Sequence, residues 1–169
     1  MTDPLAQAAM VAWCGWDPTE VVTDRTIKLD GTGNDLLLLP SLHVTGVSAI
    51  SVTDRWGTVT VPTIGPGMDC DWSENGCLVW NSWARGNVWP YGQRNVGVTY
   101  SGGYTVDTLP AEIPSVLASI TKRMPTASSG KQSKTMGSTS FTYSKTATAG
   151  ELLVVEQLVL NRYRILGAR

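Results

Sequence analysis

A chain of 169 residues has the length of one domain with room for an inserted subdomain, and its 42% hydrophobic content is enough to bury a core without disulfides or metals. No run of about 18 apolar residues is present, which argues against a membrane span, and residues 1–7 lack the basic and apolar pattern of a signal peptide. The net charge is −1, but residues 1–112 carry twelve acidic and five basic side chains, whereas residues 113–169 carry two acidic and eight basic ones. Two interpretations of this asymmetry stay open: a C-terminal third that faces a negative partner, or chance clustering on a solvated surface.

The chain is predicted to begin with a short helix over residues 4–13. Asp3 and Pro4 are residue types that favour the N-cap and the first helical position. Gly15 supplies a stop signal. The residues that recur at about the helical period, and that predict its apolar face, are Leu5, Ala8, Ala9 and Ala12.

Residues 21–105 are predicted to form a small antiparallel β unit. Polar and apolar residues alternate over residues 26–29, as in a strand with one buried face. Together with the turn-rich residues 30–35 and the apolar run 36–39, this pattern predicts a β-hairpin. Further strands are expected at 44–52, 57–61, 77–80 and 96–100, with loops rich in Gly and Pro at 62–77 and 84–94.

A second helix is predicted to open near Pro110 and to end at Pro125. Its apolar residues, at the spacing of one helix face, are Ile113, Val116, Leu117 and Ile120. The segment that follows, residues 126–148, is rich in Ser, Thr, Gly and Lys and cannot build a core of its own, although residues 138–144 have strand-forming character. We therefore expect an exposed arm or hairpin that becomes ordered against a partner.

The C-terminal segment, residues 150–169, is predicted to be a helix over 151–166 followed by a short tail. One face of this helix is expected to carry Leu152, Val155, Val159 and Arg162. The predicted fold class is therefore α+β, with residues 1–169 forming a single domain. It is a small helical bundle of the N-terminal helix and two C-terminal helices, with an inserted antiparallel β unit and an extended arm.

Three candidate chemical sites are each better explained as ordinary structure. The sequence Asp30-Gly31-Thr32-Gly33 is similar to a phosphate loop, but such a loop opens a helix, and here four leucines and a proline follow. His43 has no nucleophile motif beside it, so a surface or turn histidine is favoured over a catalytic one. The acidic cluster Asp69, Asp71 and Glu74 lacks the ordered ligands of a calcium loop, so a solvated loop is favoured over a cation site or a carboxylate pair for glycoside hydrolysis. We expect no catalytic site.

The cysteine count argues against disulfides and metals. An odd, sparse set of three, Cys14, Cys70 and Cys77, favours a reducing compartment over a disulfide scaffold. Cys70 and Cys77 would pair only if a hairpin brought them together. One histidine and no CxxC motif make a zinc site unexpected. No metal and no other cofactor is expected.

Four tryptophans, Trp72, Trp80, Trp83 and Trp89, fall within eighteen positions. Three interpretations stay open: they form the core of the β unit, they stack on sugar rings, or they anchor a subunit contact. Core packing and subunit contact are favoured over sugar binding, because tryptophan commonly serves both.

The order of motifs along the chain resembles the head-tail connector (adaptor) proteins of siphophages, notably those of actinobacterial hosts. The motifs are Cys14-Gly15-Trp16, residues 29–33, the run 36–40, residues 44–50, the Trp-Gly loop 80–89, residues 96–104, residues 109–113 with their helix, the arm 128–145 and residues 160–164. The likeness spans nearly the whole chain, and it is the order of the motifs that carries it. The chain departs from the family pattern in its short first helix, which puts the ring contacts in doubt.

The resemblance implies a virion protein without catalytic activity that forms a ring of twelve copies beneath the portal, at the neck between head and tail. In such proteins the helical bundle forms the ring wall, the C-terminal region engages the portal, and the β unit lies outside the bundle. The implied partners are the portal protein, the stopper or other neck and tail proteins, further copies of the chain and, without sequence specificity, the genomic DNA in the channel. No membrane is involved, and assembly is expected in the host cytoplasm.

The expected contact residues follow from the resemblance together with the charge distribution. Candidates for portal docking are Arg162, Tyr163, Arg164, Ile165, Leu166 and Arg169. Candidates on the arm, for a neighbouring subunit or the DNA channel, are Lys131, Lys134, Phe141, Tyr143 and Lys145. The alternative to the adaptor is a carbohydrate-binding β module that uses the Trp-rich loop.

Overall fold

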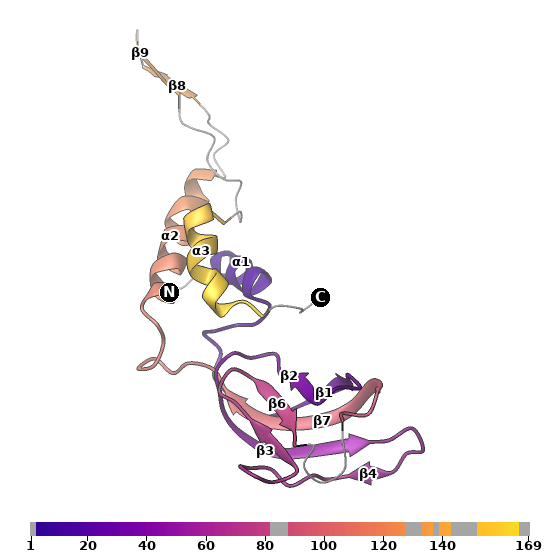
Figure 1. Ribbon diagram of the computed structural model, residues 1–169. Helices are drawn as coiled ribbons and strands as arrows, with labels where there is room; N and C mark the ends of the chain where they lie inside the picture. Colours follow the sequence, from indigo (N-terminus) through magenta and orange to yellow (C-terminus); the bar gives the residue numbers. More distant parts are fainter. Residues whose placement is uncertain (1–2, 82–87, 128–132, 137–138, 143–151, 166–169) are drawn as a thin grey trace. The chain divides into compact units, whose positions relative to one another are not determined.

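The computed structural model describes residues 3–81, 88–127, 133–136, 139–142 and 152–165. These residues divide into two compact units (Figure 1). A β unit comprises residues 18–108, and a helical unit is built from the chain before and after it, up to Asp17 and from Leu109 to Leu166. Within this part of the chain no helix is long and apolar enough to cross a membrane.

The helical unit contains α1 (Pro4–Cys14), α2 (Glu112–Ala127) and α3 (Val154–Leu160), and a 3₁₀ turn, η1 (Asn161–Tyr163), follows α3 (Figure 1). Helix α1 begins and ends as the sequence predicts. The Asp3 carboxylate accepts a hydrogen bond from the Leu5 N–H at 2.9 Å, and Gly15 closes the helix in the left-handed conformation at φ 80°.

The helices share a small apolar core. The four residues predicted for the buried face of α2, Ile113, Val116, Leu117 and Ile120, are all buried. Helix α1 contributes Ala6, Met10 and Cys14. Leu160 comes from α3, and Leu152 comes from the residues just before α3.

The predicted apolar face of α1 is wrong. Leu5, Ala8 and Ala12 are exposed, and the core instead takes the face with Met10 at its centre. The reason is that α1 is apolar almost all round, so its periodicity does not select a face.

Two other predicted helix boundaries need correction. Helix α2 passes through Pro125 and ends at Ala127, because the φ of proline is itself helical and, near a helix end, its missing N–H removes only one hydrogen bond. Helix α3 covers residues 154–160 and not 151–166. Its buried residues are Glu156 and Leu160, whereas Val155, predicted for the apolar face, is 70% exposed.

The β unit contains two antiparallel sheets. The first has the order β1-β7-β3-β4, formed by Val22–Gly31, Gly92–Gly102, Val44–Thr53 and Val59–Thr60. The second has the order β2-β6-β5, formed by Leu36–Leu38, Cys77–Trp80 and Cys70–Trp72. Both sheets contribute side chains to one core, such as Ile50, Val96 and Val98 from the first and Leu37 and Leu78 from the second.

The hairpin predicted over residues 26–39 does not form. Strand β1 pairs with β7, in a register that places Ile27 opposite Val98. Strand β2 pairs with β6 in the other sheet, with Leu37 opposite Leu78. Residues 32–35 therefore connect two sheets, a long-range outcome that the local turn chemistry does not specify.

The predicted loops are also shorter than expected. Strand β5 lies inside the predicted loop 62–77, and β7 begins at Gly92, inside the predicted loop 84–94. A short connection follows β5, and Gly76 within it adopts a φ of 76°. Gly76 also lies so close to the Ser41 carbonyl oxygen that a Cβ atom would collide with it.

The arm region contains a two-stranded hairpin of β8 (Ser133–Met136) and β9 (Thr139–Thr142). Its register places Lys134 opposite Phe141 and Met136 opposite Thr139. With three helices, antiparallel sheets and this hairpin, the predicted α+β class is confirmed.

Candidate docking surface

The C-terminal segment Arg162–Ile165 contains four of the six predicted portal-docking residues, while Leu166 and Arg169 lie outside the described part of the chain. On the arm, Lys134 and Phe141 are register partners in the β8–β9 hairpin. Lys131, Tyr143 and Lys145 lie outside the described residues. The structure therefore brings the described candidates together as two separate groups, one on each segment.

The backbone of the C-terminal segment is fastened to the end of α1. The Ile165 N–H donates to the Cys14 carbonyl oxygen at 2.9 Å. The Trp16 indole donates to the Tyr163 carbonyl oxygen at 2.6 Å, and the Trp13 indole donates to the Asn161 side-chain oxygen at 3.2 Å. Three hydrogen bonds to one short stretch, the end of α1 and its C-cap region, thus fix the path of the chain through η1 and on to Ile165.

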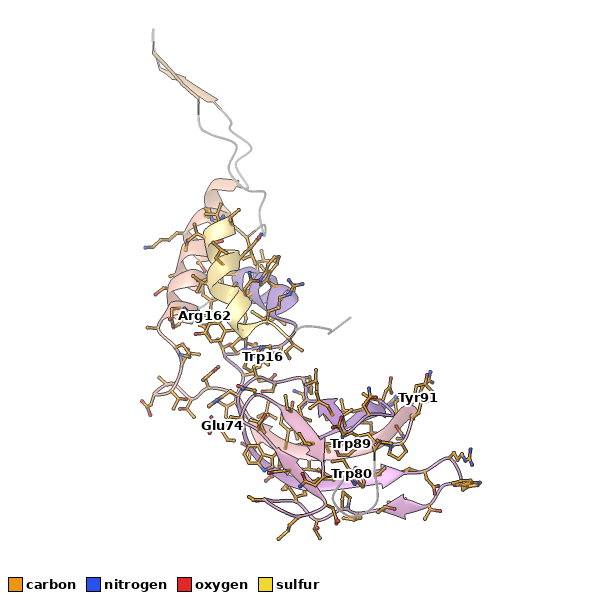
Figure 2. The ribbon with its side chains drawn as sticks, viewed as in Figure 1. Trp16, Glu74, Trp80, Trp89, Tyr91 and Arg162 are labelled. Carbon is orange, nitrogen blue, oxygen red and sulfur yellow. The ribbon has the colours of Figure 1, made fainter. Side chains whose placement is uncertain are left out.

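The side chains of this segment make only light contacts with their own chain. The Arg162 guanidinium lies 3.9 Å from the Glu112 carboxylate, and its side chain is 77% exposed (Figure 2). The Tyr163 hydroxyl donates to the same carboxylate at 3.4 Å. The Arg164 guanidinium lies 4.9 Å from the centre of the Trp13 ring. An exposed ion pair of this kind contributes only about 0.2–1 kcal/mol, so Arg162 is accessible to another carboxylate or phosphate.

A buried ion pair joins α2 to the first turn of α3. The Arg123 guanidinium donates to both oxygens of Glu156, at 2.9 and 2.7 Å. The Ser119 hydroxyl and the Leu153 N–H also donate to the Glu156 carboxylate, each at 2.9 Å. The Glu156 side chain is only 6% exposed. No local signal in the sequence indicates that Arg123 has a partner 33 positions away.

Helix α3 also presents apolar side chains to solvent. Val154 and Val155 are each 70% exposed and Leu158 is 64% exposed. Residues three and four positions apart share one side of a helix, so Leu158 lies beside both Val154 and Val155. These three residues are called here the α3 stripe. Exposed apolar side chains that lie together make this stripe a candidate contact surface. The sequence periodicity missed the stripe because it grouped Val155 on one face with Leu152, Val159 and Arg162.

The Trp-rich segment is largely core. Trp80 and Trp89 are 7% and 0% exposed and pack edge to face, with ring centroids 4.8 Å apart (Figure 2). The Trp89 indole donates to the Asp35 carbonyl oxygen at 3.0 Å. Trp72 is half-buried and packs against the same core, and Trp83 lies outside the described residues. Buried ring faces cannot stack on a sugar, so the core interpretation holds for Trp80 and Trp89.

The other sequence candidates are explained by local structure. The His43 ring stacks on Tyr104 at 4.2 Å. The Asp69 carboxylate accepts two hydrogen bonds from Thr63, from the backbone N–H at 3.0 Å and from the hydroxyl at 2.8 Å, and these bonds hold the pKa of Asp69 below its usual value. Among the residues that the structure describes, no group of three His, Cys, Asp or Glu side chains is placed to hold a metal ion.

The three cysteines are free thiols. Cys70 and Cys77 lie on neighbouring strands, but Cys70 is opposite Trp80, so the two cysteines do not face each other. Burial is the main cause that raises the pKa of Cys14 to about 11 and that of Cys70 to about 12. Both buried thiols are therefore protonated and unreactive near neutral pH.

No protein-family model and no curated protein matches the chain. Among solved structures, a chain in the virion of the native gene transfer agent (GTA) particle matches with a TM-score of 0.53 and 16% identity, over 96% of this chain and 77% of the other. A chain in the neck of the native GTA particle, computed with C12 symmetry, matches with a TM-score of 0.50 and 18% identity, over 96% of this chain and 82% of the other.

A third match is to the neck of the empty GTA particle, computed with C6 symmetry. Its TM-score is 0.50 and its identity 18%, over 96% of this chain and 78% of the other. At such identities the likeness establishes architecture. The chain has the fold of protein chains found in the GTA particle.

Proposed function

We propose that the chain is a structural head-to-tail adaptor: a neck protein that forms a ring under the portal, links the DNA-filled head to the tail and continues the DNA channel. The observation that carries this proposal is the fold likeness to chains of GTA particle necks, which extends over 96% of the chain. A partial match to one unit would not distinguish an adaptor from any other small α+β protein.

The symmetry of those necks supports a ring of this chain. Rings with C6 or C12 symmetry require head-to-tail contacts, in which two different surfaces of one subunit meet. The helical unit offers two different exposed apolar surfaces for such a contact. One is the α3 stripe, and the other is the side of α1 with Leu5, Ala8 and Ala12. Small alanines allow another helix to approach closely, and the stripe supplies larger side chains.

The C-terminal segment is the proposed portal-docking site. Its backbone is fixed to α1, which lowers the ordering cost of binding. Its side chains include the exposed Arg162, whose planar guanidinium suits a two-pronged contact with a carboxylate. Arg164, Leu166 and Arg169 would extend the contact, and the arm residues Lys131, Lys134, Phe141, Tyr143 and Lys145 would face neighbouring subunits or the channel.

An attachment assay with purified heads tests this function. Arg162→Ala should leave the chain folded but should prevent its stable attachment to portal-bearing, DNA-filled heads. Lys122→Ala, which also removes an exposed positive charge in the helical unit, is the matched control and should attach normally. Wild-type protein that fails to attach to the heads would contradict the proposed function, whereas normal attachment of Arg162→Ala would contradict only the docking residue.

A further inference from the structure

The outer face of the β2-β6-β5 sheet carries an unexplained apolar patch. Side chains alternate between the two faces of a sheet. Leu37, Leu78 and Cys70 point into the core and are buried. The other face therefore carries Leu36, Leu38 and Val79, which are 42%, 47% and 36% exposed, with the half-buried Cys77. These four residues are called here the outer patch.

The register makes the outer patch continuous and gives it an acidic border. Leu36 lies opposite Val79 and Leu38 lies opposite Cys77, so the four residues form two adjacent rows. Asp71 lies opposite Val79 on the other side of β6, at the end of the first row. The β unit as a whole is acidic, with nine acidic and five basic side chains in residues 18–108. A partner for this surface should therefore be apolar and positively charged.

The β8–β9 hairpin has the matching pattern. Register and the two-residue period place Lys134, Met136, Thr139 and Phe141 at positions on one face, while the other face takes only Ser133, Thr135, Ser140 and Thr142. The hairpin lies within residues 113–150, which contain five basic residues and no acidic one. Among the described residues its two strands pair only with each other, and an isolated two-stranded hairpin is at best marginally stable in water.

We propose that the hairpin of one copy of the chain docks on the outer patch of a second copy. In this arrangement the face of the hairpin that carries positions 134, 136 and 141 lies on Leu36, Leu38 and Val79, beside the acidic Asp71. Docking gives the two-stranded hairpin an apolar surface to pack against, and it removes the patch from water. The inference rests on the proposed function, because a ring holds the two copies side by side at a high effective concentration.

Cys77 provides a direct test, since it is a natural thiol within the patch. The full-length chain with Met136→Cys is assembled into rings, the rings are verified by electron microscopy, and they are then oxidised. Covalent oligomers should appear on a non-reducing gel. The additional substitution Cys77→Ser should abolish them. Thr135→Cys, which places a thiol on the opposite face of the hairpin, should give little or no cross-link.

The remaining outcomes separate the inference from the function. Rings that form normally but show no cross-link from Met136→Cys, or equal cross-linking from Thr135→Cys, would overturn the docking while leaving the adaptor function standing. A disulfide confined within single chains would show that the hairpin docks on its own β unit and would overturn the proposal. Wild-type chain that forms no ring, alone or on heads, would contradict the proposed function and the docking with it.

Discussion

At the scale of single residues, Glu156 is a central polar contact of the helical unit. Its carboxylate is buried and accepts four hydrogen bonds, two of them from Arg123. Burying a charge is tolerated only when its partners are complete. Arg123 lies before the arm and Glu156 lies after it, in the first turn of α3. Their ion pair therefore holds together the two segments that flank the arm. We regard it as structural and not as a docking residue.

Glu156→Gln should lower the free energy of unfolding by about 3 kcal/mol, because it leaves Arg123 buried without its counter-charge. Urea denaturation followed by circular dichroism measures this change. Glu112→Gln, which removes the exposed partner of Arg162, should cost less than about 1 kcal/mol. Equal losses in the free energy of unfolding for the two variants would show that the buried Arg123–Glu156 pair stabilises the fold no more than an exposed ion pair does.

The buried thiols predict an alkaline loss of stability. An unfolded cysteine ionises near 9, whereas burial raises the pKa of folded Cys14 to about 11. Below pH 9 the Cys14 thiol is protonated in both the folded and the unfolded chain, so its contribution to the free energy of unfolding is constant. Above it the unfolded chain alone loses the proton, so stability falls as pH rises from about 9 to about 11. The difference in stability between wild type and Cys14→Ala should shrink over that range, and a constant difference would contradict this account.

At the scale of elements, the sequence predicted best what local chemistry determines. Helix α1 begins at its aspartate cap, and the strand β6 falls at Cys77–Trp80 as expected. The predictions that failed concern features that depend on residues distant in the sequence. Leu36–Leu38 pairs with β6 and not with the preceding strand, and Glu156 occupies a core position because Arg123 neutralises it. Of the proposed docking surface, the charges of the C-terminal segment were predictable, but the α3 stripe was not, because periodicity cannot tell a buried apolar face from an exposed one.

The N-cap of α1 gives a prediction at this scale. Asp3→Ala removes the acceptor for the Leu5 N–H and should lower the free energy of unfolding by about 1 kcal/mol. Asp3→Asn, which keeps a capping oxygen, should restore most of that loss. Thermal unfolding of both variants is the measurement, and identical melting temperatures for wild type and Asp3→Ala would contradict the cap.

The α3 stripe predicts a separation of folding from assembly. Leu158 is 64% exposed, so Leu158→Lys should leave the stability of the single chain nearly unchanged. The same substitution should prevent ring formation, because it would bury a lysine in the apolar contact. Val106→Lys, at a position in the β unit that is 95% exposed, is the matched control. Light scattering and electron microscopy distinguish single chains from rings, and unchanged rings of Leu158→Lys would exclude the stripe as the contact.

At the scale of the whole molecule, the two units differ in composition and charge. The β unit is closed around a core that includes Trp80 and Trp89, while the helical unit exposes the apolar α3 stripe and the basic Arg162. If residues of the arm face the DNA channel, that contact should be non-specific and should weaken as salt concentration rises.

The most direct test of the adaptor function is electron microscopy of particles labelled with an antibody against this chain. The account predicts label at the junction of head and tail, and ring-shaped density of many copies there in averaged images. Label along the tail, over the capsid surface or absent from the particles would contradict it.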